Sequence, residues 1–140
     1  MKPTPFEPMT DLAPIFFSPE LCHAAERLKK NGLSWKPHVG CFVWDKDEYI
    51  KVSSPFPNRI YFILNLGHFL KIFDTLEKIS EQLIWIPTWN QARQICEKNH
   101  IAPDEIIQRL FAENALKNDL LILYEIILEN LKKNPIRNPQ

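Results

Sequence analysis

The stretch that decides the fold begins at Cys41-Phe42-Val43-Trp44 and continues, after a polar turn, to Arg59-Ile60-Tyr61-Phe62-Ile63-Leu64. Both segments are short and rich in β-branched and aromatic residues, which favour strands. Between them, Tyr49 to Val52 alternates as a strand does, so we expect a hairpin around Asp45-Lys46-Asp47. The short apolar run Leu83 to Ile86 is a further strand candidate.

Helical patterns flank this stretch on both sides. Ser18 and Pro19 predict the start of a helix that continues to about Lys30. A second helix is expected from about Thr75 to Gln82, and the segment from Phe69 to Phe73 fits either the beginning of that helix or another short strand.

The C-terminal third predicts three more helices. They begin near Thr88, Pro103 and Asn118, where capping residues or a first-turn proline stand. In the middle one, the apolar side chains are spaced for burial; they are Ile106, Ile107, Leu110 and Phe111.

These patterns predict an α+β fold with a small antiparallel sheet of three or four strands, packed with about five helices. We expect a single domain over residues 18–134, preceded by a Pro-rich extended arm at 1–17 and followed by a flexible tail at 135–140.

The last helix, expected to end near Lys133, has an unusually wide apolar face. A helix packed on one side of a small domain needs only a narrow apolar stripe. Either this helix is central, or its second face meets another chain. The residues concerned are Leu120, Leu121, Ile122, Leu123, Tyr124, Ile126, Ile127, Leu128 and Leu131.

Composition narrows the function classes. The chain has 140 residues, with 17 basic and 17 acidic side chains, so no net charge attracts nucleic acid or an anionic membrane. Three widely spaced cysteines predict free thiols and a reducing, cytoplasmic location rather than a disulfide framework. No run of apolar residues is long enough to span a bilayer.

Motifs for common chemistry are weak or absent. The three glycines are far apart, which excludes a Gly-rich phosphate loop or dinucleotide fingerprint. Cys22, His38 and Cys41 lack a fourth ligand, so we expect no metal site and no cofactor. The one nucleophile–base pair that can be drawn is Cys41 with His68, as weak catalytic candidates.

A ligand site, if the protein has one, is expected where two polar patches meet His68. The first is the Pro-flanked loop that ends at Arg59, and the second is the helix start at Thr88 and Trp89. The sequence favours a different function, however: a non-enzymatic interaction or regulatory module that forms a homodimer through its C-terminal helix or N-terminal arm. A further protein partner is compatible with this reading. The alternative is a small enzyme or ligand-binding protein with its site near Arg59, His68 and Thr88.

Overall fold

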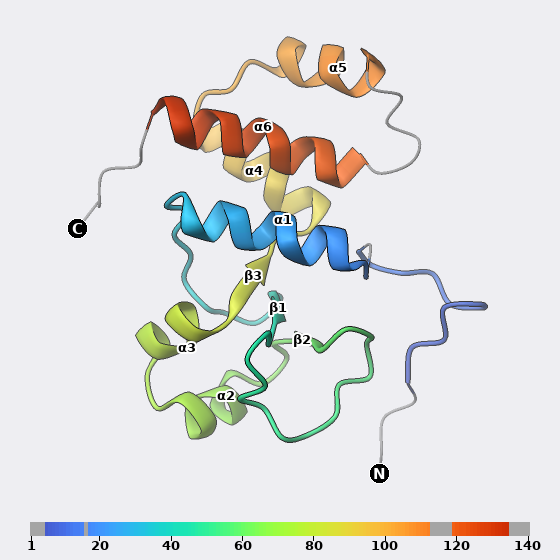
Figure 1. Ribbon diagram of the computed structural model, residues 1–140, viewed down its shortest axis with the longest axis vertical. Helices are drawn as coiled ribbons and strands as arrows, with labels where there is room; N and C mark the ends of the chain where they lie inside the picture. The colour runs from blue at the N-terminus through green and yellow to red at the C-terminus, as the bar shows by residue number, and fades with distance from the viewer. Residues whose placement is uncertain (1–4, 16, 113–118, 135–140) are drawn as a thin grey trace.

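The computed structural model describes residues 5–15, 17–112 and 119–134, and within them the chain is α+β (Figure 1). Six helices and three strands follow in the order α1 (Pro19–Lys30), β1 (Phe42–Trp44), β2 (Ile60–Phe62), α2 (Leu66–Phe73), α3 (Leu76–Gln82), β3 (Ile84–Ile86), α4 (Trp89–Lys98), α5 (Pro103–Ala112) and α6 (Asp119–Lys133). The predicted fold class and the helical C-terminal third are confirmed.

The sheet is antiparallel with the strand order β2-β1-β3. β1 is the central strand, and Phe42 stands opposite both Phe62 and Ile86, while Trp44 stands opposite Ile60 and Ile84. The strand predicted at Leu83–Ile86 therefore exists, and it pairs with β1 at the edge away from β2.

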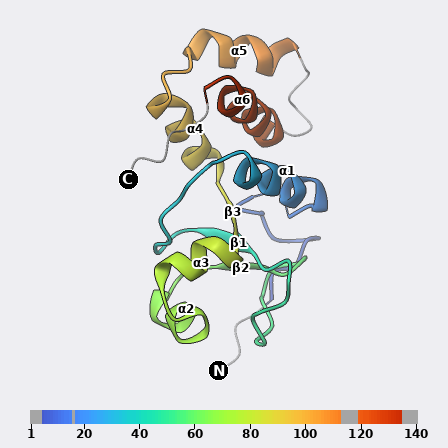
Figure 2. The same ribbon diagram turned by 60° about the vertical axis from the view of Figure 1, so that its left-hand side comes forward.

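Helices cover both faces of this sheet. Phe42, Ile60 and Ile86 lie in one buried cluster with the apolar residues of α1, α4 and α6, while Val43 and Ile63 lie in a second cluster with those of α2 and α3. Figure 2 shows α2 and α3 on one side of the strands and α1 and α6 on the other. Because successive side chains alternate across a strand, both sets are buried, and β1 leaves no aromatic face in solvent.

The predicted hairpin partner Tyr49–Val52 is wrong, because this segment forms no strand. The Asp45 carboxylate accepts hydrogen bonds from the backbone N–H groups of Tyr49 and Ile50, at 2.9 and 2.7 Å. Those donors are thereby removed from any ladder, and Glu48 takes a left-handed φ of 58°. Asp45 therefore closes a turn after β1, and residues 49–52 do not pair with β1 as a hairpin strand.

Phe69 to Phe73 is helical. Asn65 caps α2 by accepting from the Gly67 N–H at 2.9 Å, and Asp74, with φ of 81°, separates α2 from α3. Thr75 then caps α3 by accepting from the Lys78 N–H. The helix predicted from about Thr75 to Gln82 is confirmed, with Thr75 as its cap.

The described part of the N-terminal arm lies against its own domain. The Phe6 N–H donates to the Pro55 carbonyl at 2.8 Å, and the Phe17 ring stacks on Phe56 with centroids 5.0 Å apart. Residues 1–4 and the predicted tail at 135–140 lie outside the described residues, as does the predicted cap Asn118.

The last helix is central. α6 lies between α1, α4 and α5, and these neighbours bury most of its wide apolar face, while Leu121 and Leu128 are half-buried. Its buried residues are Leu120, Ile122, Leu123, Tyr124, Ile126, Ile127 and Leu131.

Candidate functional site

Arg59 holds the Asp45 turn together. Asp45 is fully buried, and its carboxylate oxygen Oδ2 accepts from Arg59 Nη2 at 2.8 Å. The same guanidinium donates to the Ile50 carbonyl at 2.7 Å and to the Asp45 carbonyl at 3.2 Å. The hydrogen bond to Asp45 raises the pKa of Arg59. Each group is therefore satisfied internally, and the pair fixes the path of the chain between β1 and β2.

Cys41 and His68 are placed very differently. Cys41 is fully buried in the cluster on the α2–α3 side of the sheet, and burial raises the pKa of its thiol. His68 lies in α2 with an exposed side chain. Across the described residues no hydrogen bond or ion pair joins the two side chains. A buried thiol with a raised pKa is a poor nucleophile, so this geometry provides no activated cysteine.

Arg59 and Thr88 lie at opposite ends of the sheet. Arg59 precedes β2, at the end where Ile60 pairs with Trp44. Thr88 follows β3, at the end where Ile86 pairs with Phe42. Thr88 caps α4 through a reciprocal pair of hydrogen bonds with Gln91, at 3.2 and 3.0 Å. The structure does not bring the predicted ligand residues into one cavity.

A cavity of about 390 Å³ does lie beside Thr88, and its walls include His38, Trp85 and Lys98. An adjoining cavity of about 580 Å³ shares these three and adds Trp35, whose ring stacks on Trp85 at 5.8 Å. Neither indole N–H has a hydrogen-bond partner in the structure. Both N–H groups are buried, however, so neither is offered to a molecule in the cavity.

A groove lies between α4 and α5 and has exposed apolar residues at its edge. It has a volume of about 580 Å³, and its walls include Trp89 and His100 from the α4 side and Ile106, Ile107 and Leu110 from α5. Of the predicted ligand residues, Trp89 is therefore placed at this groove. The Trp89 side chain is 37% exposed.

The burial predicted for α5 is wrong, because no residue of this helix is buried. Ile106 and Leu110 pack partly against the core, whereas Ile107 is 51% exposed and Phe111 is 84% exposed. The apolar stripe of α5 is two residues wide at each turn, and α6 covers only half of it. The sequence prediction did not identify this surface, although the adjacent pairs Ile106-Ile107 and Leu110-Phe111 show that the apolar stripe is wide.

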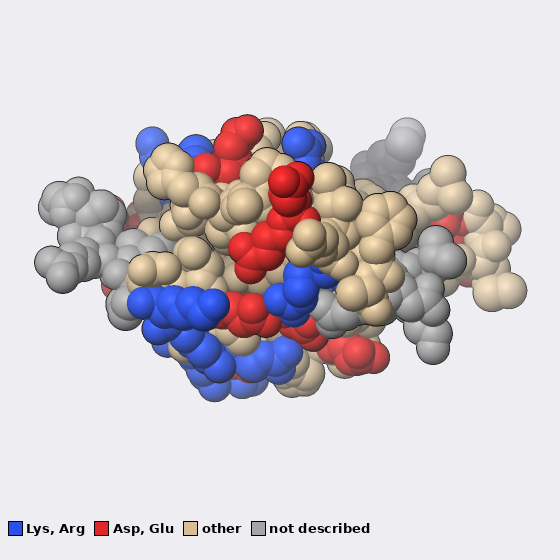
Figure 3. Space-filling view, turned by 90° about the horizontal axis from the view of Figure 1, so that it is seen from above, with Lys and Arg blue, Asp and Glu red and all other residues tan. Residues whose placement is uncertain are grey.

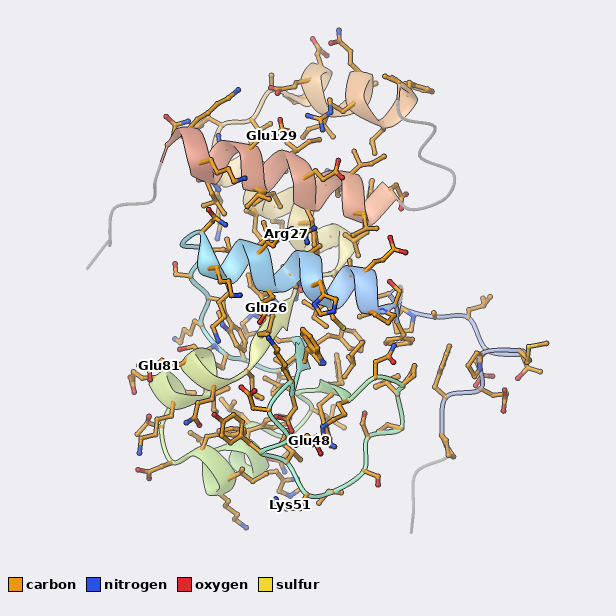
Figure 4. All side chains as sticks on the ribbon, in the orientation of Figure 1. Glu26, Arg27, Glu48, Lys51, Glu81 and Glu129 are labelled. Atoms are coloured by element: carbon orange, nitrogen blue, oxygen red, sulfur yellow. The ribbon has the colours of Figure 1, made fainter. Side chains whose placement is uncertain are left out.

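Ion pairs fasten α5 to α6. Arg109 Nη1 donates to Glu129 Oε1 at 2.9 Å, and Arg109 Nη2 lies 3.6 Å from Glu125 Oε2. Figure 4 shows Glu129 on the side of α6 that faces α5. Partly exposed pairs of this kind are worth about 0.2–1 kcal/mol each, so α5 is held more weakly than the buried helices.

The other cysteines and the possible metal ligands among the described residues give no further candidate site. Burial raises the pKa of both Cys22 and Cys96 to about 11, which keeps these thiols protonated. No group of three or more His, Cys, Asp or Glu residues is arranged to hold a metal ion in the described ranges. None of the helices described there is long and apolar enough to cross a membrane.

Charge on the α5–α6 end of the molecule is mixed in sign. Figure 3 shows basic atoms gathered along one edge of this view, with acidic atoms beside them and uncharged surface between. This face therefore lacks the continuous positive potential that would attract an anionic partner such as nucleic acid.

Comparison with protein families, with curated proteins and with solved structures finds no match to this chain.

Proposed function

We propose that this protein is a non-enzymatic interaction module that self-associates, and that it does so through the surface formed by α4 and α5. The single observation that carries the proposal is the exposure of Ile107 and Phe111 on α5, the helix that forms one wall of the groove that Trp89 also lines. Large apolar side chains gathered at a groove on a folded domain are typical of a protein contact.

This proposed interface differs from the two that the sequence suggested, which were the C-terminal helix and the N-terminal arm. The wide face of α6 packs inside its own chain, which leaves little of that face for a partner. The N-terminal arm stays as the rival interface, since Met9 is 88% exposed and Leu12 is 96% exposed. A groove of about 450 Å³ is lined by Phe6, Pro8 and Asp11 of this arm, and the groove between α4 and α5 is larger, at about 580 Å³.

A second candidate function is binding of a small molecule in the cavity beside Thr88. The stacked Trp35 and Trp85 rings, with His38 and Lys98 on the same walls, favour it. A compound that raises the melting temperature of the wild type but not of His38→Ala would support this function. If His38→Ala and Thr88→Ala leave every such shift unchanged, the cavity is not a binding site.

The proposal includes a cytoplasmic location. All three cysteines are buried free thiols, a state that a reducing compartment maintains.

The test is the sedimentation of the full chain from about 1 μM to about 200 μM, the range that detects weak homodimers. The proposal expects the mass to rise with concentration from 16.5 kDa towards twice that value. Phe111→Ser should abolish the rise, and Leu12→Ser serves as the matched control because its side chain is at least as exposed. Loss of association in Leu12→Ser alone would place the interface on the arm. A constant mass of 16.5 kDa in the wild type would contradict self-association, and the exposed surface would then have to serve a different protein.

A further inference from the structure

The two adjoining cavities that Trp85 lines share part of their walls, and together they form what we call the Trp85 cavity. One wall is a stripe of α4, where Gln91, Ile95 and Lys98 follow at intervals of four and three positions and so project from the same side of the helix. Another wall is the segment between α1 and β1, whose Trp35 stacks on Trp85 of β3 (Figure 1). The edge of the sheet therefore carries a hollow bounded by a helix and two aromatic rings.

The charge on these walls is of one sign. Lys36 and Lys98 line the cavity, the third ionisable side chain there is His38, and none of the described residues on its walls is Asp or Glu. Glu97, which precedes Lys98 in the sequence, lines the groove on the α5 side of α4 instead. Within the described part of the chain, neither lysine forms an ion pair. Two ammonium groups without an acidic counterpart therefore border one cavity, which favours an anionic ligand.

The uncharged parts of the walls suit a small molecule with a flat apolar body. Trp35 and Trp85 are both half-buried, so part of each ring system remains for contact with a ligand. Asn90 and Gln94 add side-chain amides, which both donate and accept hydrogen bonds. The larger of the two cavities has a volume of about 580 Å³, within the range of sites that bind small molecules.

We propose that the Trp85 cavity binds a small aromatic anion, with its negative group at Lys36 and Lys98 and its ring against Trp35 and Trp85. This inference rests on the second candidate function, binding of a small molecule at this site, and names the class of that molecule. It does not depend on self-association, because the α4–α5 groove uses the other side of α4. A cationic ligand is disfavoured, since it would meet two lysines and no carboxylate.

Titration calorimetry of the wild type with three probes on one ring system tests the charge. Indole-3-acetate carries a carboxylate, indole-3-acetamide is its neutral analogue, and tryptamine is a cation. Indole-3-acetate should bind, the amide should bind about tenfold more weakly, and tryptamine should give no signal up to about 10 mM. Phenyl phosphate is the second anion, and the tighter of the two anions identifies the ligand as a carboxylate or a phosphate.

Substitutions of the lysines test the location. Lys98→Gln should weaken the binding of indole-3-acetate about three- to fivefold, and Lys36→Gln/Lys98→Gln about tenfold or more, because each change removes one exposed ammonium group. Binding of the amide should stay the same in both variants. Lys71→Gln is the matched control, since Lys71 is an exposed lysine of α2 that lines neither cavity. Circular dichroism verifies that each variant folds.

The outcomes separate the ligand class from the site. If the amide binds as tightly as indole-3-acetate, or if the double variant keeps the wild-type affinity, the ligand class is wrong; retained affinity in His38→Ala would then reject the site as well. An equal loss in Lys71→Gln would reduce the effect to net charge and overturn the proposal. If no probe binds up to about 10 mM, both the site and the ligand class are wrong. Weaker binding in the Lys36 and Lys98 variants alone supports the proposal.

Discussion

Helices α5 and α6 are neighbours in the chain and in space, yet they use their apolar residues in opposite ways. α6 buries seven residues, whereas α5 buries none. The cause is the number of neighbours: α1, α4 and α5 surround α6, while α5 packs on α6 from the outside. A wide apolar face can therefore mean a central helix or an uncovered one, and the spacing of the residues alone does not distinguish them.

This difference divides the molecule into a part that stabilises the fold and a part that is available for contact. Full burial of a leucine or isoleucine side chain contributes about 1.5–3 kcal/mol, and α6 contributes such burial several times. Ile107 and Phe111 are largely exposed in the single chain, so their side chains contribute little burial energy to the fold. Association would remove their exposed area from water.

Leu123→Ala should have the largest effect on the stability of the protein. Leu123 is fully buried in α6, so the loss of its side chain creates a cavity and should lower the free energy of unfolding by about 2–5 kcal/mol. Ile107→Ala is the matched control on α5 and should change that free energy by less than about 0.5 kcal/mol. Chemical denaturation measures both. Equal losses would show that α5 is as important to the core as α6.

Asp45→Asn should have the next largest effect, at a site remote from both helices. The substitution replaces a carboxylate that accepts from Tyr49, Ile50 and Arg59, and we expect a loss of about 1–3 kcal/mol. The dissociation constant of the proposed dimer should not change once the variant is folded. A variant of normal stability would show that the buried pair is not the element that holds the turn.

Arg109→Gln should loosen α5 without unfolding the domain. The substitution removes the ion pairs with Glu125 and Glu129, which should cost about 0.3–1 kcal/mol. Hydrogen exchange should become faster in α5 and stay unchanged in α6. Faster exchange in both helices would mean that they open as one unit.

The smallest effect is expected from Glu26 on α1, and it should depend on pH. Lys46 lies 2.6 Å from the Glu26 carboxylate, and this hydrogen bond lowers the pKa of Glu26 from the ordinary 4.5. Figure 4 places Glu26 on the side of α1 that faces the sheet. Because the pKa is lowered on folding, the stabilisation is complete above the ordinary value and disappears as the pH falls through the lowered one.

Glu26→Gln should therefore destabilise the protein at pH 7 by about 0.2–1 kcal/mol and have little effect near pH 2. Thermal unfolding of the wild type and the variant at both pH values provides the measurement. A difference of the same size at both pH values would exclude the ion pair as its cause.

Local patterns predicted most of the elements. Ser18 and Pro19 begin α1 as expected, and the Ser18 hydroxyl accepts from the Leu21 N–H at 3.2 Å. The strand-forming segments around Phe42 and Tyr61 form β1 and β2, although each is shorter than its apolar run. Capping and alternation involve residues close in the sequence, which is why the sequence alone reveals them.

The predictions that were wrong involved contacts between residues far apart in the sequence. The turn that replaced the expected hairpin joins Asp45 to the nearby N–H groups of Tyr49 and Ile50, and it also includes Arg59, fourteen positions after Asp45. The exposure of Phe111 depends on which helices cover α5, and periodicity does not contain that information. The predicted ligand residues were grouped by their position near loops, but the strand register places Arg59 and Thr88 at opposite ends of the sheet.

Hydrogen–deuterium exchange at low and at high protein concentration tests most directly the claim that α5, and not α6 or the N-terminal arm, carries the contact surface. The account predicts that raising the concentration slows exchange in residues 89–112 and leaves residues 5–15 and 120–131 unchanged. Slower exchange confined to residues 5–15, or no change in residues 89–112 while the mass of the protein rises, would contradict it.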